Sequence, residues 1–387
     1  MNNNSIFRFM ISTNLRFGAG EIEKLVDEIK SLSFSTVAAI VDQGVFEHEY
    51  VKKSLKKVID AGINIDIFKS EAVEPTYDYL ESFKENFKGK KYNCLIGIGG
   101  GSAIDLTKGI AVLLTNEGSA LSFRGFPKLK NKPLAVIAIP TTAGTGSEVT
   151  YNAVFIDAKE KKKLGINSIL NFPVLAIIDP LVLADCPKSV AISAGADALV
   201  HALESYGHRK STLLSRMYSK EAFRLIFNNL TRALDDPDVI DMKGNVALGA
   251  YLAGIALVNA GSGFAGAFSY PLGVMYKVPH GFAGAVFLTS ILKFNIEKGY
   301  TDYAELYDLI DGSNQAISRK EKNLEFLKKI DLLFEKIKIP KKLSFYGLRQ
   351  KDLDFLVSQY DMLKPAIDQN PIEVTKDDAK DIINNLA

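Results

Sequence analysis

Residues 94–109 read CLIGIGGGSAIDLTKG, and this stretch decides the fold. Its first five residues, 94–98, form a short apolar run that predicts a buried strand, and residues 102–114 have the periodicity of a helix. Three glycines, Gly99 to Gly101, join the two. A strand that passes through a glycine turn into a helix is typical of a parallel α/β sheet.

The same alternation extends through the first half of the chain. Strands are expected at 36–41, 63–68, 94–98, 134–139 and 174–178, with helices at 21–31 and 102–114 between some of them. Two further runs, 149–156 and 163–169, are compatible with a hairpin. Strands that alternate with helices indicate a parallel sheet covered on both faces.

After about residue 185 the strand-like runs almost disappear. Helical periodicity dominates the remaining segments, which are 187–206, 213–234, 243–260, 281–298 and 319–337. We therefore expect an α/β domain at residues 1–184 and an all-helical domain at residues 185–387.

Bulk composition limits the partners and the compartment. The net charge of +2 gives no strong basic field for nucleic acid. No uninterrupted apolar stretch approaches the ~20 residues of a membrane helix, so no membrane span is expected. The N-terminal residues lack the charged start and apolar core of a secretory signal. Two scattered cysteines fit a reducing compartment, which favours the cytoplasm.

The glycine turn has two interpretations. Gly99, Gly100 and Gly101 would let the backbone approach a diphosphate at the N-terminus of the following helix, where the dipole favours an anion. The alternative is a tight turn with no ligand. Ser102 and Asp105 have the spacing of a helix-capping pair, with the serine as N-cap.

Two other strand ends carry polar residues. The loop 140–148 follows the strand at 134–139 and holds Thr141, Thr142 and Thr145. Ligands of open α/β sheets bind at such carboxyl ends, so two polar loops favour a phosphate or nicotinamide site over two coincident turns. Asp42 ends the strand at 36–41. It could accept the ribose hydroxyls of NAD and repel the phosphate of NADP, or it could be an ordinary turn residue.

Histidine chemistry must draw on only four residues. Asp197 and His201 are four positions apart and share one helix face, where they could grip a metal ion or form a plain side-chain contact. His280 stands in a Pro-His-Gly sequence before a helix, as a ligand or as a packing residue. His208 could face the same cleft, but we expect it to be exposed to solvent beside its basic neighbours.

Several long motifs together resemble the iron-containing alcohol dehydrogenase family over nearly the whole chain. The motifs are Phe17-Gly18-Ala19-Gly20, GGGSAIDLTKG at 99–109, PTTAGTGSEVT at 140–150, AIIDP at 176–180, GADALVHALESY at 195–206, Pro279-His280-Gly281 and Gln369-Asn370-Pro371. The resemblance implies an architecture like that of dehydroquinate synthase. It also implies NAD-dependent hydride transfer with a small alcohol or aldehyde, and a homodimer or larger homo-oligomer.

The resemblance also assigns roles to residues. It implies that the diphosphate binds at Gly99, Gly100, Gly101 and Ser102, the nicotinamide side at Thr141, Thr142 and Thr145, and the ribose at Asn152 and Lys163, with Asp42 selecting NAD. It implies that Asp197, His201 and His280 are ligands of a divalent metal, iron or zinc.

The metal site departs from the family pattern. The fourth ligand of the family is a histidine fourteen residues before His280, and here that position is Gly266. The family has a second histidine near the substrate, and at the corresponding position this chain has Tyr270. Either three ligands still hold an ion, which zinc tolerates, or no metal binds and Tyr270 or His208 handles the proton. A lyase like dehydroquinate synthase that uses NAD, or an NAD-binding relative without activity, are the alternative functions.

Overall fold

The computed structural model describes residues 6–71, 73–236 and 239–387, which divide into two compact units. The first, called here the sheet unit, comprises Ser12–Val190 and Asp236–Leu248. The second, the helical unit, comprises Met1–Ile11, Ala191–Asp235 and Gly249–Ala387. Neither unit is one continuous piece of chain, since each contains a short segment from elsewhere in the sequence.

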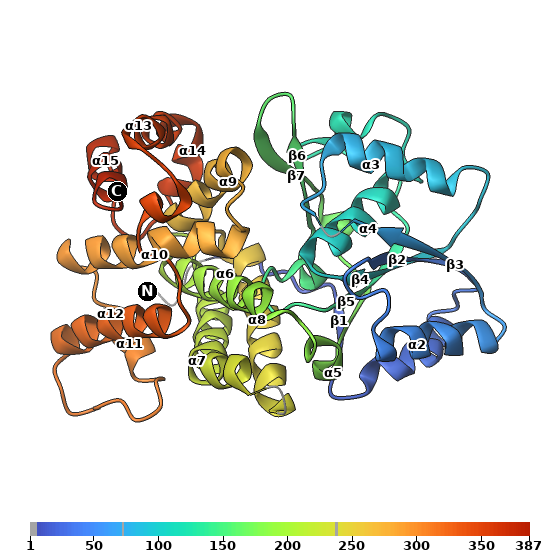
Figure 1. Cartoon of the computed structure of the whole chain (residues 1–387), viewed down its shortest axis with the longest axis horizontal. Coiled ribbons are helices and arrows are strands. Elements are labelled where there is room, and N and C mark those ends of the chain that lie inside the picture. The colour runs from blue at the N-terminus through green and yellow to red at the C-terminus, as the bar shows by residue number, and fades with distance from the viewer. Residues whose placement is uncertain (1–5, 72, 237–238) are drawn as a thin grey trace. The chain divides into compact units, whose positions relative to one another are not determined.

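The sheet unit is built on a six-stranded parallel sheet with the strand order β1-β8-β5-β4-β2-β3 (Figure 1). A separate antiparallel hairpin, β6-β7, confirms the paired runs expected at 149–156 and 163–169. The strands are β1 (Asn14–Phe17), β2 (Thr36–Asp42), β3 (Asn64–Ser70), β4 (Cys94–Gly99), β5 (Ala135–Pro140), β6 (Asn152–Asp157), β7 (Lys162–Asn167) and β8 (Leu175–Ile178). The sequence analysis missed only the edge strand β1.

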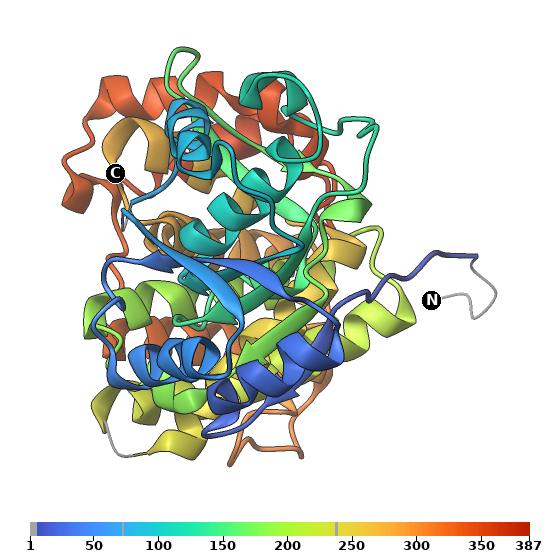
Figure 2. The same ribbon diagram turned by 90° about the vertical axis from the view of Figure 1, so that its right-hand side faces the viewer.

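Helices cover both faces of this sheet, as the uninterrupted apolar strands require. Successive residues of β2 point to opposite faces, so Val37 packs with α1 and α2 while Ala38 packs with α3 and α4. Figure 2 shows the strands between these two helical layers. The helices of this unit are α1 (Leu25–Ser31), α2 (Glu49–Asp60), α3 (Tyr77–Lys84), α4 (Gly101–Leu113) and α5 (Pro180–Leu183). The expected fold class is therefore confirmed.

The helical unit contains no strand among its described residues. The five helical segments expected from periodicity are all present, as α6, α7, α8, α10 and α12. The helices are α6 (Lys188–Gly207), α7 (Leu213–Asp235), α8 (Ile240–Ala260), α9 (Phe264–Tyr276), α10 (His280–Glu297), α11 (Ala304–Tyr307), α12 (Arg319–Lys336), α13 (Gln350–Ser358), α14 (Tyr360–Ile367) and α15 (Lys376–Asn384). α6 and α8 begin within the sheet unit.

Within the described part of the chain, no single helix has both the length and the apolar composition needed to cross a membrane. α8 and α9 meet that test only when taken as a pair, and they are bent by 103° at the break between them.

Candidate functional site

Three neighbouring parallel strands of the sheet unit end in the residues singled out from sequence. Val41 of β2 pairs with Ile98 of β4, and Gly99 of β4 pairs with Pro140 of β5. The backbone N–H of Thr141 donates to the carbonyl of Gly99 at 3.0 Å. The glycine turn, the threonine loop and Asp42 therefore lie together at the carboxyl edge of the sheet, where ligands of such sheets bind.

The three glycines of the turn differ in what they permit. Gly99 has φ +153°, and a Cβ built on it would lie 2.6 Å from the Cβ of Asp42. A Cβ on Gly101 would lie 2.6 Å from Oγ1 of Thr145. A Cβ on Gly100 would meet only Thr142, at 3.4 Å and beyond. The fold therefore requires glycine at the first and third positions, whereas the second leaves room for a ligand to approach the backbone.

The N-terminus of α4 has the features of an anion site. Its N-cap is Gly100, and in the described structure no side chain caps this end. The first backbone N–H groups of a helix have no partner within the helix, so they are suited to bind a diphosphate. The expectation that Ser102 would be the N-cap is wrong, because the helix begins one residue before it, at Gly101.

Asp105, the supposed partner of Ser102, instead anchors the threonine loop. Its carboxylate accepts a short hydrogen bond from the hydroxyl of Ser147 and another from the N–H of Val154 at 2.9 Å. Lys108, one turn later, is fully buried and donates to the carbonyl of Ser147 at 2.9 Å. Burial lowers the pKa of Lys108. Sequence reasoning missed this link, because its partners are some forty residues apart.

Asp42 is half-buried, and burial raises the pKa of its carboxyl group. Its Oδ1 accepts the N–H of Gly44 at 2.7 Å. That bond is typical of an aspartate in a turn. It occupies one carboxylate oxygen, so Asp42 can be a turn residue and still accept hydrogen bonds from a ribose.

The hairpin separates the two residues assigned to the ribose. Asn152 begins β6 and pairs with Asn167, to which its side chain also donates at 3.0 Å. Lys163 lies opposite Ile156, about 13 Å along the strand. Its ammonium is 2.8 Å from the carboxylate of Glu74. The backbone thus does not bring Asn152 and Lys163 together.

In the helical unit, the three expected metal ligands converge. Oδ1 of Asp197 lies 3.6 Å from Nε2 of His201 and 3.6 Å from Nε2 of His280. All three ligand atoms lie within 4.8 Å of one another. Two donors bonded to one tetrahedral zinc ion at about 2.1 Å are roughly 3.4 Å apart. The spacing therefore fits one shared ion better than direct hydrogen bonds, which are shorter.

The two ring nitrogens of His280 have different neighbours: Nε2 faces Asp197, and Nδ1 lies beside Ser269. The hydroxyl of Ser269 donates to the carbonyl of Gly266 at 2.6 Å and lies 3.2 Å from Nδ1 of His280. When the single hydroxyl proton is used in the bond to Gly266, Ser269 accepts from Nδ1–H of the ring. Nε2 of a neutral ring then presents its lone pair to the carboxylate of Asp197, an arrangement that a cation between them would stabilise.

The ring of His201 is also oriented for this cluster. Its side chain is only 9% exposed, and within the described residues its Nδ1 is buried without a hydrogen-bond partner. The ring therefore directs Nε2 alone toward a polar group. Two imidazoles and a carboxylate are a donor set that suits zinc or iron.

Gly266 lies in the first turn of α9, where the place of a side chain is already filled. A Cβ there would stand 1.9 Å from Oγ of Ser262 and 3.1 Å from Oε2 of Glu204. The absent fourth ligand is therefore not an open gap. Sequence reasoning missed Glu204, although it follows His201 by three residues on the same helix.

The two residues considered for proton transfer have different surroundings. The ring of Tyr270 lies beside that of His280, with 5.6 Å between centroids. His208 is buried, so the expectation that it is exposed is wrong. Its Nδ1 accepts the N–H of Lys210 at 3.0 Å, and burial lowers its pKa to about 4. Within the described residues it is not a member of the metal cluster.

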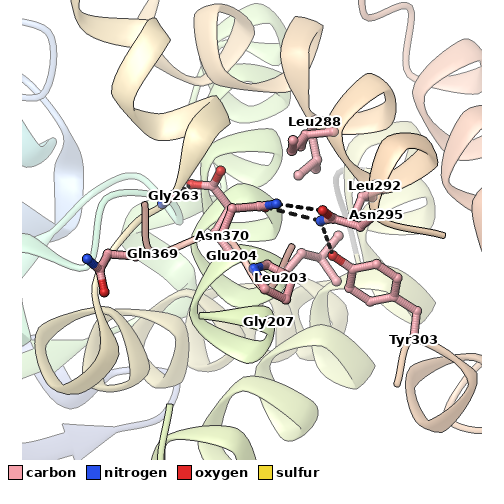
Figure 3. A pocket seen from close by; sticks show the side chains of 12 residues that line it. Leu203, Glu204, Gly207, Gly263, Leu288, Leu292, Asn295, Tyr303, Gln369 and Asn370 are labelled. Atoms are coloured by element: carbon pink, nitrogen blue, oxygen red, sulfur yellow. Dashed lines mark hydrogen bonds between the residues drawn. The ribbon is translucent and has the colours of Figure 1, made fainter. Parts of the chain in front are cut away.

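A small cavity is lined in part by Glu204 (Figure 3). Its polar lining includes Asn295, Asn370 and Tyr303, which are joined by hydrogen bonds. Its volume of about 10 Å³ holds at most one water molecule. This cavity is too small to be the substrate site.

Comparison with known proteins agrees with these features. Residues 12–180 match the family described as iron-containing alcohol dehydrogenase, and residues 191–387 match the C-terminal part of the same family. The chain belongs to the iron-containing alcohol dehydrogenase family. The expected family and enzyme class, alcohol and aldehyde oxidoreductases, are therefore confirmed.

Individual relatives are similar over nearly their full length. The chain is 29% identical to 1,3-propanediol dehydrogenase of Citrobacter freundii over 91% of both chains. It is 28% identical to lactaldehyde reductase of Escherichia coli, over 96% of this chain and 97% of the relative. A crystal structure of 1,3-propanediol oxidoreductase superposes with a TM-score of 0.92, covering 99% of this chain and 100% of the other at 27% identity.

Proposed function

We propose that this enzyme transfers a hydride between NAD(H) and a small alcohol or aldehyde, with a divalent ion held by Asp197, His201 and His280. The observation that carries the proposal is the convergence of these three groups, with Oδ1 of Asp197 at 3.6 Å from Nε2 of each histidine and all three ligand atoms within 4.8 Å of one another. A bound divalent ion would polarise the substrate oxygen and stabilise the alkoxide form of the alcohol. Zinc is our first choice and iron the second, because zinc works with three protein ligands and one open position.

The residues of the sheet unit would bind the cofactor. The uncapped N-terminus of α4 suits the diphosphate, and Gly100 leaves space for it. Asp42 would accept ribose hydroxyls and disfavour the additional phosphate of NADP. NAD would supply the hydride acceptor, while the protein binds and orients it. The proposal therefore assigns cofactor binding to residues 1–184 and binding of the substrate oxygen to residues 185–387.

The remaining cofactor contacts follow the family assignment. The proposal retains Ser102, Thr141, Thr142 and Thr145 at the strand ends, where the loops meet. It also retains Asn152 and Lys163 at the hairpin, as two separate contacts rather than one pair.

Tyr270 is the better candidate for a role in proton transfer. Its ring lies beside His280, so its hydroxyl belongs to the same region of the helical unit. His208 is neutral near pH 7, because its pKa is lowered to about 4. A neutral ring whose Nδ1 already accepts a hydrogen bond has no proton to donate from that atom. We therefore assign His208 a structural role.

The small diols and aldehydes named for the relatives suggest the substrate class. A short alcohol with a second polar group, or the corresponding aldehyde, is the first choice for a screen. We further propose that the enzyme acts in the cytoplasm as a homodimer or larger homo-oligomer, without nucleic acid or membrane partners. The low net charge supports the absence of a nucleic-acid partner.

One experiment tests the main proposal: elemental analysis of the purified protein together with a screen for NADH formation on small alcohols. We expect near-stoichiometric zinc or iron and NAD-linked turnover. Tight NAD binding with no turnover on any alcohol or aldehyde would instead support a relative without activity. Turnover in a fully metal-free preparation would contradict the assignment of Asp197, His201 and His280.

A further inference from the structure

The side chain of Glu204 receives an unusual number of hydrogen bonds from one helix end. Its Oε1 accepts from the N–H of Ala265 at 2.6 Å. Its Oε2 accepts from the N–H groups of Gly263 and Gly266 at 2.8 and 3.1 Å, and from the hydroxyl of Ser262 at 2.7 Å. Glu204 of α6 therefore caps α9 from outside, where the N-cap Gly263 has no side chain to do so.

Glu204 is also close in sequence to two metal-cluster residues. It follows His201 by three positions and Asp197 by seven, which places all three on one face of α6. Glu204 is not a member of the three-donor cluster found in the described structure. Four donors already bind its carboxylate. These bonds direct the carboxylate to the end of α9.

The link from Glu204 to the cluster passes through one residue, Gly266. The N–H of Gly266 donates to Glu204, while its carbonyl accepts from Ser269 at 2.6 Å. Ser269 in turn shares a hydrogen bond of 3.2 Å with Nδ1 of His280. The same turn of α9 carries Tyr270, whose ring lies beside His280. The carboxylate thus fixes the helix turn that orients His280.

We infer that Glu204 is a positioning residue for the cation site: with Ser262 it fills the place of the missing fourth ligand and holds the first turn of α9 against His280. This inference rests on the proposed function for its link to a metal ion. The same arrangement requires glycine at position 266, because a side chain there would collide with Ser262.

The test compares Co²⁺ binding by the intact protein and by three variants, using competition with a chelator and the visible absorption of the bound ion. Glu204→Gln keeps the shape but places an amide group against backbone N–H donors. Loss of a residue that supports a metal ligand weakens binding about 10–100-fold, and we expect that range here. The absorption should change as well, because it reports the geometry around the ion. Glu325→Gln is the matched control, since Glu325 pairs with Lys328 at the surface of α12.

Ser269→Ala keeps the inference falsifiable if Glu204→Gln does not fold. It removes the link between Gly266 and His280 without touching the cap, so it should weaken Co²⁺ binding while thermal unfolding changes little. A folded Glu204→Gln variant with the affinity and spectrum of the unmodified protein would overturn the inference. Unchanged binding by Ser269→Ala would also overturn it.

A second measurement separates this inference from the proposed function. If the unmodified protein binds no Co²⁺, the metal assignment fails, but the orientation of His280 can still be read from ¹⁵N shifts of the imidazole rings. With four histidines, each signal can be assigned by single substitution. We expect the Nδ1–H form of His280 in the unmodified protein and its loss in Glu204→Gln. The same tautomer in both would overturn the positioning role.

Discussion

A methyl group on Gly99 would stand 2.6 Å from the Cβ of Asp42, so the glycine turn and the aspartate are packed as one unit. They end two adjacent parallel strands. A ligand whose diphosphate lies at the turn can therefore reach the carboxylate with its ribose. Under the proposed function, this contact would tie the choice of cofactor to the geometry of the sheet edge.

We predict that Asp42 makes the enzyme prefer NAD to NADP. Asp42→Gly should raise the ratio of kcat/KM for NADP to that for NAD by about tenfold or more, which corresponds to about 1.4 kcal/mol. Asp42→Asn is the matched control for charge, because its amide oxygen can still accept from Gly44. Equal use of both cofactors by the unmodified enzyme would remove Asp42 from this role.

The glycine turn allows a comparison between neighbouring positions. Gly100→Val should fold, because only ordinary contacts surround the first added carbon, but it should weaken NAD binding about tenfold or more by keeping the diphosphate from the backbone. Gly101→Ala should instead lower the free energy of unfolding by about 1–3 kcal/mol, because it collides with Thr145. Calorimetric titration and urea unfolding separate the two effects. Unchanged NAD affinity in a folded Gly100→Val variant would mean that the turn binds no cofactor.

The contribution of Glu148 to stability should fall as the pH rises through the range in which this side chain ionises, opposite to the contribution of the buried His208. Glu148 is buried, and burial raises its pKa from 4.5 to about 7. Between these values Glu148 holds more protons in the folded protein than in the unfolded chain, so its contribution to the free energy of unfolding decreases with increasing pH. Relative to the unmodified protein, Glu148→Gln should therefore gain stability as the pH rises from 4.5 to 7.5, measured by urea unfolding. Parallel profiles for the two proteins would show that Glu148 does not titrate in this window.

Most of the fold followed from local pattern, because strands such as 36–42 and 94–99 are continuous apolar runs and the long helices keep one periodicity. α9 was missed because Pro271 interrupts the helical signal of its sequence. The pairing of Asp197 with His201 was expected because they share one face of a helix, whereas His280, on another helix, was added only by the family resemblance. Contacts such as Glu204 with Ser262, 58 residues apart, were not found, because only tertiary packing brings them together.

Removing the metal should stop the reaction. Treatment with a strong chelator, or the substitution His280→Ala, should abolish bound metal and NADH formation together, since Asp197 and His201 alone are a weak site. Tyr270→Phe should leave the metal in place and lower turnover. If the chelated protein stays active and Tyr270→Phe abolishes activity, proton transfer by Tyr270 without metal is the correct mechanism.

The last prediction concerns the restoration of the missing imidazole at Gly266. The sequence alone predicts that Gly266→His tightens metal binding, because one more preorganised ligand adds attraction without further ordering of the chain. The structure reverses this prediction, since the new Cβ would lie 1.9 Å from the hydroxyl of Ser262. We expect the single variant to bind Co²⁺ about tenfold more weakly, because displacing Ser262 disturbs the cap on α9 and with it His280. The double variant Ser262→Gly with Gly266→His removes the collision, so it should recover the affinity of the unmodified protein or exceed it.

Ser262→Gly alone is the control for the loss of the hydroxyl. Chelator competition and thermal unfolding should be measured on all three variants. Tighter binding by Gly266→His alone, with unchanged stability, would show that Ser262 moves aside freely and that the place of the fourth ligand remains available.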